Sequence, residues 1–156
     1  MSLKIPQRGI IWGVGPVMLL PTGTDRLLTT EKWGVGPTAV VLTQIDRWTF
    51  GALANHIWSV AGDDARPDIS ATFLQPFVSY TTADAWTFAL NTESTYDWTT
   101  SSWSVPINFS ISKLTKIAAQ PVSLGAGIRY WAESPAGGPE GLGVRATMTF
   151  LFPTSN

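Results

Sequence analysis

The chain has no cysteine among its 156 residues and a single histidine, His56. Without cysteine, neither a disulfide framework nor a thiolate metal site can form, and one imidazole is too few for a zinc site. The GxSxG motif that carries a nucleophilic serine is also absent. We therefore predict no metal, no cofactor and no catalytic residue, and we do not expect an enzyme.

Charge is scarce as well. Charged residues make up 13% of the chain and the net charge is −1, whereas about 25% is usual for a soluble domain. A soluble protein needs a charged surface to stay dispersed, so this composition favours contact with a lipid bilayer or detergent. The chain has no basic run, which argues against nucleic acid as a partner.

Long apolar runs are missing too. No stretch of 18 or more apolar residues occurs, which excludes a transmembrane helix. The remaining way to cross a bilayer is a β-barrel, whose strands alternate apolar and polar residues. Residues 1–8 lack the apolar segment and the cleavage site of a secretory signal, so this chain shows no export signal of its own.

What the sequence does contain is period-2 alternation, which predicts eight strands. They lie at roughly 10–21, 32–44, 47–60, 69–81, 85–98, 103–114, 121–132 and 141–152. These segments exceed the usual strand of about 5–6 residues and suit a tilted bilayer crossing. Long connections follow the first, third and seventh strands, and tight turns follow the second and fourth, as in outer-membrane barrels with periplasmic termini. We expect tails at 1–9 and 153–156 around a barrel at 10–152.

Each strand has an apolar face and a face of glycine and small polar residues. In the last strand, Val144 and Met148 alternate with Arg145 and Thr147. A soluble barrel gives the same alternation with its apolar face inward, but its outer face needs more charge than this chain has. Aromatic residues gather at strand ends, as in the interfacial girdles of membrane barrels. The predicted girdle residues are Trp12, Trp33, Trp48, Trp58, Trp86, Trp98, Trp103 and Tyr130.

The charges in mid-strand positions share the polar face. Glu93, Arg129 and Arg145 are expected to form a buried ion cluster, which needs hydrogen-bonding partners. Four amides have the same inward parity and complete the predicted polar cluster of the lumen: Asn55, Gln75, Asn91 and Asn108. Two roles remain open for this cluster. It is either a structural network that fixes strand register or a cation-lined constriction that selects anionic solutes.

The pentapeptide WGVGP occurs twice, at 12–16 and 33–37. A phosphate-binding glycine loop needs a helix after it, whereas both copies lie within strand patterns. Their glycines belong to a predicted glycine wall on the lumen face, made of Gly13, Gly15, Gly34, Gly36, Gly51, Gly125, Gly127 and Gly143. Glycine allows the sharp coiling of a small barrel. Since these strands become neighbours only in a closed barrel, we predict closure between the first and last strands.

The order of motifs along the chain resembles a known family. After WGVGP and VMLLPTGTDRLL come KWGVGPTAVVL, WTFGALANHIWSVAG, TFLQPFVSYTT, LNTESTYDW, WSVPINF, GIRYWAESPAGGPEG and FLFP. Together they resemble the C-terminal part of bacterial outer-membrane transporter barrels related to the phenol-degradation meta-pathway proteins. The resemblance implies an outer-membrane β-barrel with a role in the passage of small solutes, and it assigns no catalytic site.

The sequence thus predicts an all-β, antiparallel, up-and-down transmembrane barrel of about eight strands in a bacterial outer membrane. Its expected role is porin-like transport of small solutes through a polar lumen. Two alternatives stay open: a soluble β-barrel that binds an apolar small molecule, and a truncated structural barrel without transport. An eight-strand piece can close on itself or form a homo-oligomer through its strand edges.

Overall fold

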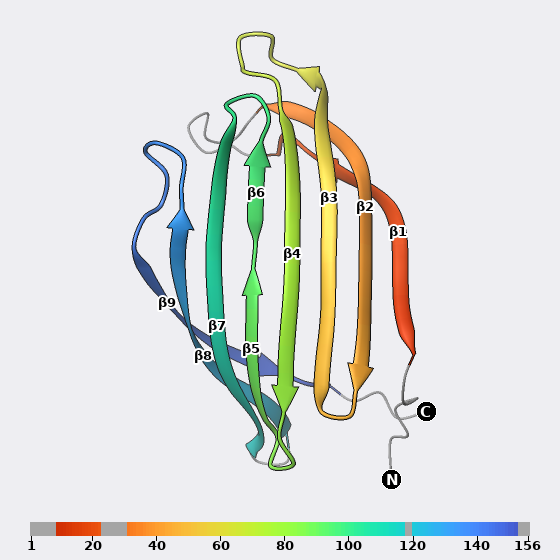
Figure 1. Cartoon of the computed structure of the whole chain (residues 1–156), viewed down its shortest axis with the longest axis vertical. Helices are drawn as coiled ribbons and strands as arrows, with labels where there is room; N and C mark the ends of the chain where they lie inside the picture. Colours follow the sequence, from red (N-terminus) through yellow and green to blue (C-terminus); the bar gives the residue numbers. More distant parts are fainter. Residues whose placement is uncertain (1–8, 23–30, 118–119, 153–156) are drawn as a thin grey trace.

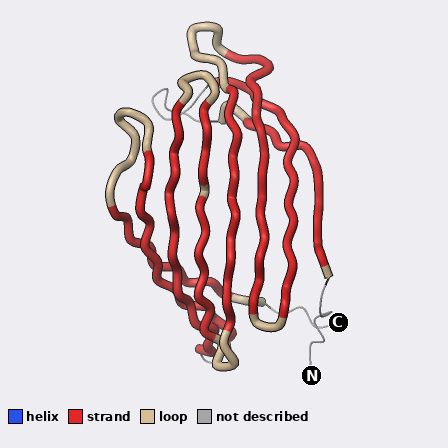
Figure 2. The backbone as a smooth tube through the Cα atoms, viewed as in Figure 1, coloured by secondary structure: helices blue, strands red, loops and turns tan. Residues whose placement is uncertain are grey.

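The computed structural model describes residues 9–22, 31–117 and 120–152, and these residues form nine antiparallel strands (Figure 1). The strands are β1 (Ile10–Leu19), β2 (Lys32–Ile45), β3 (Trp48–Gly62), β4 (Ser70–Thr81), β5 (Trp86–Thr92), β6 (Ser94–Asp97), β7 (Ser102–Ile117), β8 (Gln120–Glu133) and β9 (Leu142–Phe150). Figure 2 shows that these described residues form strands and loops, with no helix among them. The predicted all-β antiparallel class is confirmed. The predicted tails lie outside the described residues, apart from Gly9.

Nine strands replace the predicted eight because the expected strand at 85–98 is interrupted at Glu93. The pairing register with β4 is the same for β5 and β6, and so is the register with β7. The two short strands therefore occupy a single strand position in the sheet. Prolines flank the break on both sides, Pro76 in β4 and Pro106 in β7. The Glu93 N–H donates to the Pro106 carbonyl at 3.3 Å, but proline has no N–H to donate in return. The ladder is therefore weakened at this level.

The strands follow the order β1-β2-β3-β4-β5-β7-β8-β9, with β6 beside β4 and β7. Within the described ranges β1 pairs only with β2, β9 pairs only with β8, and no Cα atom of β1 lies within 8 Å of one in β9. The predicted closure between the first and last strands is therefore not made. Closing eight strands requires a turn of about 45° per strand. Figure 1 shows the middle strands side by side, with bending concentrated at the two ends of the sheet.

The strands are strongly staggered. One row of directly paired residues crosses the whole sheet through Ile11, Leu42, Gly51, Phe77, Asn91, Asn108, Arg129 and Gly143. The row begins near the start of β1 and ends near the start of β9, which runs in the opposite direction. Phe150, the last residue of β9 on the short-turn side, lies seven residues beyond Gly143. Over seven strand spacings this stagger corresponds to a tilt of about 35°, at about 3.3 Å per residue and 4.8 Å between strands.

The connections divide the sheet into a short-turn end and a long-loop end. Residues 46–47 and 82–85 make tight turns at one end, where Asp46 and Ala85 have positive φ. Residues 63–69 and 134–141 make longer loops at the other end. The shorter turn at 98–101 lies at that end too. β1 begins and β9 ends on the short-turn side (Figure 1). The predicted alternation of connection lengths is confirmed for these segments.

The sheet has almost no apolar core. Among the described residues, Val122 is the one buried hydrophobic side chain. The accessible surface is 11283 Å², whereas a compact monomer of this mass exposes about 7,700 Å². A single layer with an uncovered apolar face contributes to this excess, in contrast to the two or three packed layers of ordinary domains.

Candidate functional site

Within the described part of the chain, the polar face of the sheet holds one ion pair, between Glu93 and Arg129. The Arg129 Nη2 group donates to the Glu93 carboxylate, and Arg129 Nε donates to Asn108 Oδ1 at 2.5 Å. Asn108 and Arg129 are direct ladder partners in β7 and β8, so the sheet register itself places the amide beside the guanidinium. The side chains of Arg129 and Glu93 are 25% and 29% exposed. The pair is thus partly screened by solvent.

The strand break places the acid. Because β5 and β6 keep the same register on either side of it, Glu93 lies at the ladder position between Gln75 in β4 and Pro106 in β7. Its side chain then reaches across β7 to Arg129 in β8. Strand parity alone does not predict this arrangement. The signal in the sequence is the pair of prolines, Pro76 in β4 and Pro106 in β7, in the two strands that flank β5 and β6.

A small cavity of about 80 Å³ adjoins the ion pair, with Asn91, Asn108 and Arg145 in its lining. Asn91 Oδ1 and Asn108 Nδ2 are buried without a hydrogen-bond partner, although the two residues are direct ladder neighbours. Buried amide atoms are normally paired, and here an unpaired acceptor and an unpaired donor stand side by side. The site can therefore accept a small polar group, or water, between them.

Arg145 corrects the prediction of a three-charge cluster. It lines the cavity, yet it forms no ion pair or hydrogen bond with any described residue, and it is exposed. Its ladder partner is Gly127, two residues from Arg129 on β8, so a group of the same charge lies nearby. Glu93 already pairs with Arg129, which leaves Arg145 as an accessible cation on the polar face.

Two of the predicted amides lie apart from this cavity. Asn55 in β3 pairs with Thr38 and Phe73, and Gln75 lies beside Glu93 in the ladder. Neither side chain forms a hydrogen bond with another described residue, and neither lines the cavity. The structure thus gathers five of the seven predicted cluster residues around one cavity.

The predicted glycines form two groups. Interior glycines leave no room for a side chain: a Cβ at Gly36 would collide with the His56 carbonyl, and one at Gly51 would collide with the Phe77 ring. The other crowded positions are Gly34, Gly125 and Gly127. Glycines of the edge strands have space, because a Cβ at Gly15 would meet nothing within 4 Å. Gly13 and Gly143 are similarly open, with nearest atoms at 3.6 and 3.5 Å.

The predicted girdle aromatics lie in two bands on the apolar face. The band at the short-turn end contains Trp12, Trp48 and Trp86, and the band at the long-loop end contains Trp33, Trp58, Trp98, Trp103 and Tyr130. Some of these rings contact other aromatic rings, with centroids 4.9 Å apart for Trp48 and Tyr80 and 4.8 Å apart for Tyr96 and Trp103. Along β3 the bands are separated by the ten residues from Trp48 to Trp58, which is about 33 Å of strand.

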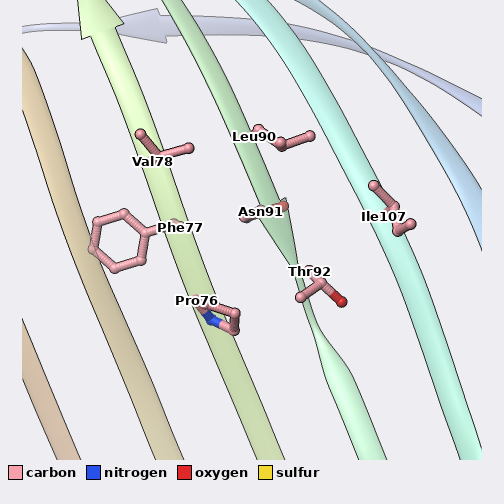
Figure 3. Close-up of a pocket in the computed structure, with 7 residues that line it drawn as sticks. All are labelled: Pro76, Phe77, Val78, Leu90, Asn91, Thr92 and Ile107. Carbon is pink, nitrogen blue, oxygen red and sulfur yellow. The ribbon is translucent and has the colours of Figure 1, made fainter.

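Between the bands the apolar face is shallowly hollowed. An open hollow of about 390 Å³ is lined by Val78, Leu90 and Ile107 among others. Figure 3 shows these three side chains on three neighbouring strands. Within the described residues no helix is long and apolar enough to cross a membrane.

Charged groups gather instead at the long-loop end. Lys32 Nζ lies 3.0 Å from Asp68 Oδ1, and Arg66 Nε lies 3.0 Å from Glu31 Oε2. Hydrogen bonds from Lys32 and from the Ser59 hydroxyl, together with the charge of Lys32, lower the pKa of Asp68. This end of the sheet therefore meets water through paired charges.

No family model, curated protein or solved structure matches this chain.

Proposed function

We propose that this chain forms the wall of a β-barrel in a bacterial outer membrane and takes part in porin-like passage of small solutes through a polar lumen. The observation that carries the proposal is the uncovered apolar face. Large apolar side chains between the two aromatic bands are exposed across the sheet, including Val41, Phe50, Leu90, Phe109 and Ile128. A monomer in water exposes such a continuous surface only at high cost, whereas hydrocarbon covers it without cost.

The dimensions of the sheet support the same conclusion. With a tilt of about 35–45°, the span of about 33 Å between Trp48 and Trp58 becomes about 25 Å along the bilayer normal, which is the height of the apolar band in outer-membrane barrels. The stagger of the ladder gives a tilt inside this range. Long loops at one end and tight turns at the other follow the same architecture.

The polar face supports a lumen role. Glycine, serine, threonine and asparagine make up much of this face, together with larger side chains such as Phe77, and Arg145 is an exposed cation on it. A free cation on a lumen wall attracts anions, so small anionic solutes are the favoured class. The transport part of the proposal is supported by the resemblance of the motif order to outer-membrane transporter barrels.

The first test is solubility followed by reconstitution. The protein is expected to be monodisperse in detergent, to precipitate in detergent-free buffer, and to give ion conductance in planar bilayers. A monodisperse, concentrated solution without detergent would overturn the membrane assignment. Insertion without conductance would support a structural barrel and overturn the transport assignment.

A charge reversal then tests the lumen. Arg145→Glu is expected to lower the anion-to-cation permeability ratio measured from reversal potentials. The matched control is Arg47→Glu, which makes the same charge change in the tight turn at 46–47, outside the strands. Equal shifts in the two variants would show that Arg145 does not line the conducting path.

A further inference from the structure

Among the residues that the structure describes, the two edge strands β1 and β9 each have a partner on one side alone. On their outer faces, Val14 of β1 is 74% exposed and Val144 of β9 is 85% exposed, compared with 47% for Leu90 in the middle of the sheet. Each edge strand also has a row of backbone N–H and C=O groups pointing away from its only neighbour. In a bilayer each such unpaired group costs several kcal/mol, so membrane strands occur only in closed sheets. The two edges must therefore be covered.

The topology favours a second copy of this chain as the cover. The sheet has eight strand positions, and every neighbouring pair is antiparallel, so β1 and β9 run in opposite directions. A two-fold axis along the barrel axis brings β9 of one copy beside β1 of the other in antiparallel orientation, with both copies in the same sense across the membrane. The two resulting contacts are identical, and the ring closes without a further edge.

We propose that two copies of this chain close one 16-stranded barrel through two β9–β1 contacts, a proposal that rests on the membrane function proposed above. Self-closure of one chain gives an interior just wide enough for side chains, whereas barrels of 16–18 strands enclose an aqueous channel. The polar face then lines a water-filled lumen, with one Arg145 from each copy. The solute path is thus incomplete without the second copy.

The faces and the aromatic bands set the register of the contact. Even-numbered residues of both edge strands face outward, so even residues must pair with even ones. When the short-turn ends of β1 in one copy and β9 in the other are aligned, Trp12 pairs with Phe150. In the same register Val14 pairs with Met148. The open glycines Gly13 and Gly15 then lie beside Thr149 and Thr147 of the other copy.

Cysteine crosslinking tests this register directly, because the chain has no cysteine of its own. Single variants Val14→Cys and Met148→Cys, refolded together in detergent and oxidised, are expected to form a disulfide-linked dimer. The double variant Val14→Cys/Met148→Cys is expected to give a dimer joined at both contacts. The matched control combines Val14→Cys with Val144→Cys. This moves the β9 cysteine four residues away from Met148, too far from position 14 for a disulfide to form.

The outcomes separate the possibilities. A disulfide within one chain of the double variant would indicate self-closure and overturn the dimer. Equal crosslinking by the shifted control would indicate random collision and overturn it too, as would a detergent-corrected mass of one chain, 16.9 kDa, rather than twice that value. Flotation with lipid vesicles reports on the membrane assignment separately. A floating, monomeric protein overturns the dimer alone, whereas a protein that does not float overturns the proposed function.

Discussion

The two WGVGP copies have the same sequence but different surroundings. In the copy on the edge strand β1, Gly15 faces open space; in the copy on the interior strand β2, Gly36 lies against the backbone of β3. The two copies are themselves paired, with Pro16 directly opposite Pro37. The same five residues thus form an uncrowded edge and a crowded interior within one sheet.

The difference shows that position in the sheet, and not the motif, determines what a glycine does. Proline cannot donate to a ladder, and the bridges between β2 and β3 skip Gly36 and Pro37 before resuming at Thr38. At this gap the chains approach closely enough that only hydrogen fits at Gly36. At the edge strand the corresponding glycine has no third strand to meet.

The largest effect on stability is expected at Gly36, the crowded glycine of the interior copy. Gly36→Ala forces a methyl group into the His56 carbonyl, and because the obstacle is backbone, no side-chain rotation relieves it. We expect a loss of at least about 3 kcal/mol, the upper part of the range for overpacking. The measurement is the urea unfolding midpoint in lipid vesicles or detergent.

The matched control is Gly15→Ala, the same substitution at the same place in the motif. Within its own copy nothing lies within 4 Å of the new methyl group, and its proposed neighbour in the other copy is the side chain of Thr147 and not backbone. Its effect should therefore stay within about 0.5 kcal/mol, as for surface changes. Equal losses in the two variants would contradict the distinction between edge and interior.

A smaller effect on stability is expected for charged residues, which also differ between the interior and the edge of the sheet. Glu93→Gln removes the partner of an interior arginine, whereas Arg145→Gln removes an unpaired arginine at the edge. A hydrogen bond to a charged group contributes about 1.5–3 kcal/mol, and the partial exposure of Arg129 keeps the expected loss for Glu93→Gln within that range. Arg145→Gln should cost less than about 0.5 kcal/mol. If the two variants unfold at the same midpoint, the interior ion pair contributes nothing to stability.

Local patterns in the sequence were sufficient to predict much of the fold. Alternation fixed the strand positions, the two faces and the parity of Glu93, Arg129 and Arg145, because side-chain direction along a strand depends only on residue number. Turn residues such as Asp46 gave the connections. These properties are set within one strand or one hairpin.

Properties that depend on several strands together were not predictable in this way. Closure depends on curvature accumulated over eight positions, and the structure leaves β1 and β9 apart. The break at Glu93 depends on the coincidence of Pro76 and Pro106 across two separate ladders. The isolation of Arg145 depends on register between β8 and β9. Each requires long-range pairing that no periodicity within one strand reveals.

The smallest effect is expected at the start of the interior motif. Lys32 precedes Trp33 and is buried, and its ammonium group holds the exposed carboxylate of Asp68; the edge copy has Ile11 at the corresponding place. Because the pKa of Asp68 is lowered in the folded state, its contribution to stability is present above the unfolded pKa of about 3.9. That contribution is lost as pH falls through the lowered value. NMR titration of the Asp68 carboxyl should therefore show an upward pKa shift in Lys32→Met, while Lys116→Met, at the opposite end of the sheet, leaves it unchanged. An unaltered Asp68 pKa in Lys32→Met would show that the interior copy is not anchored by this pair.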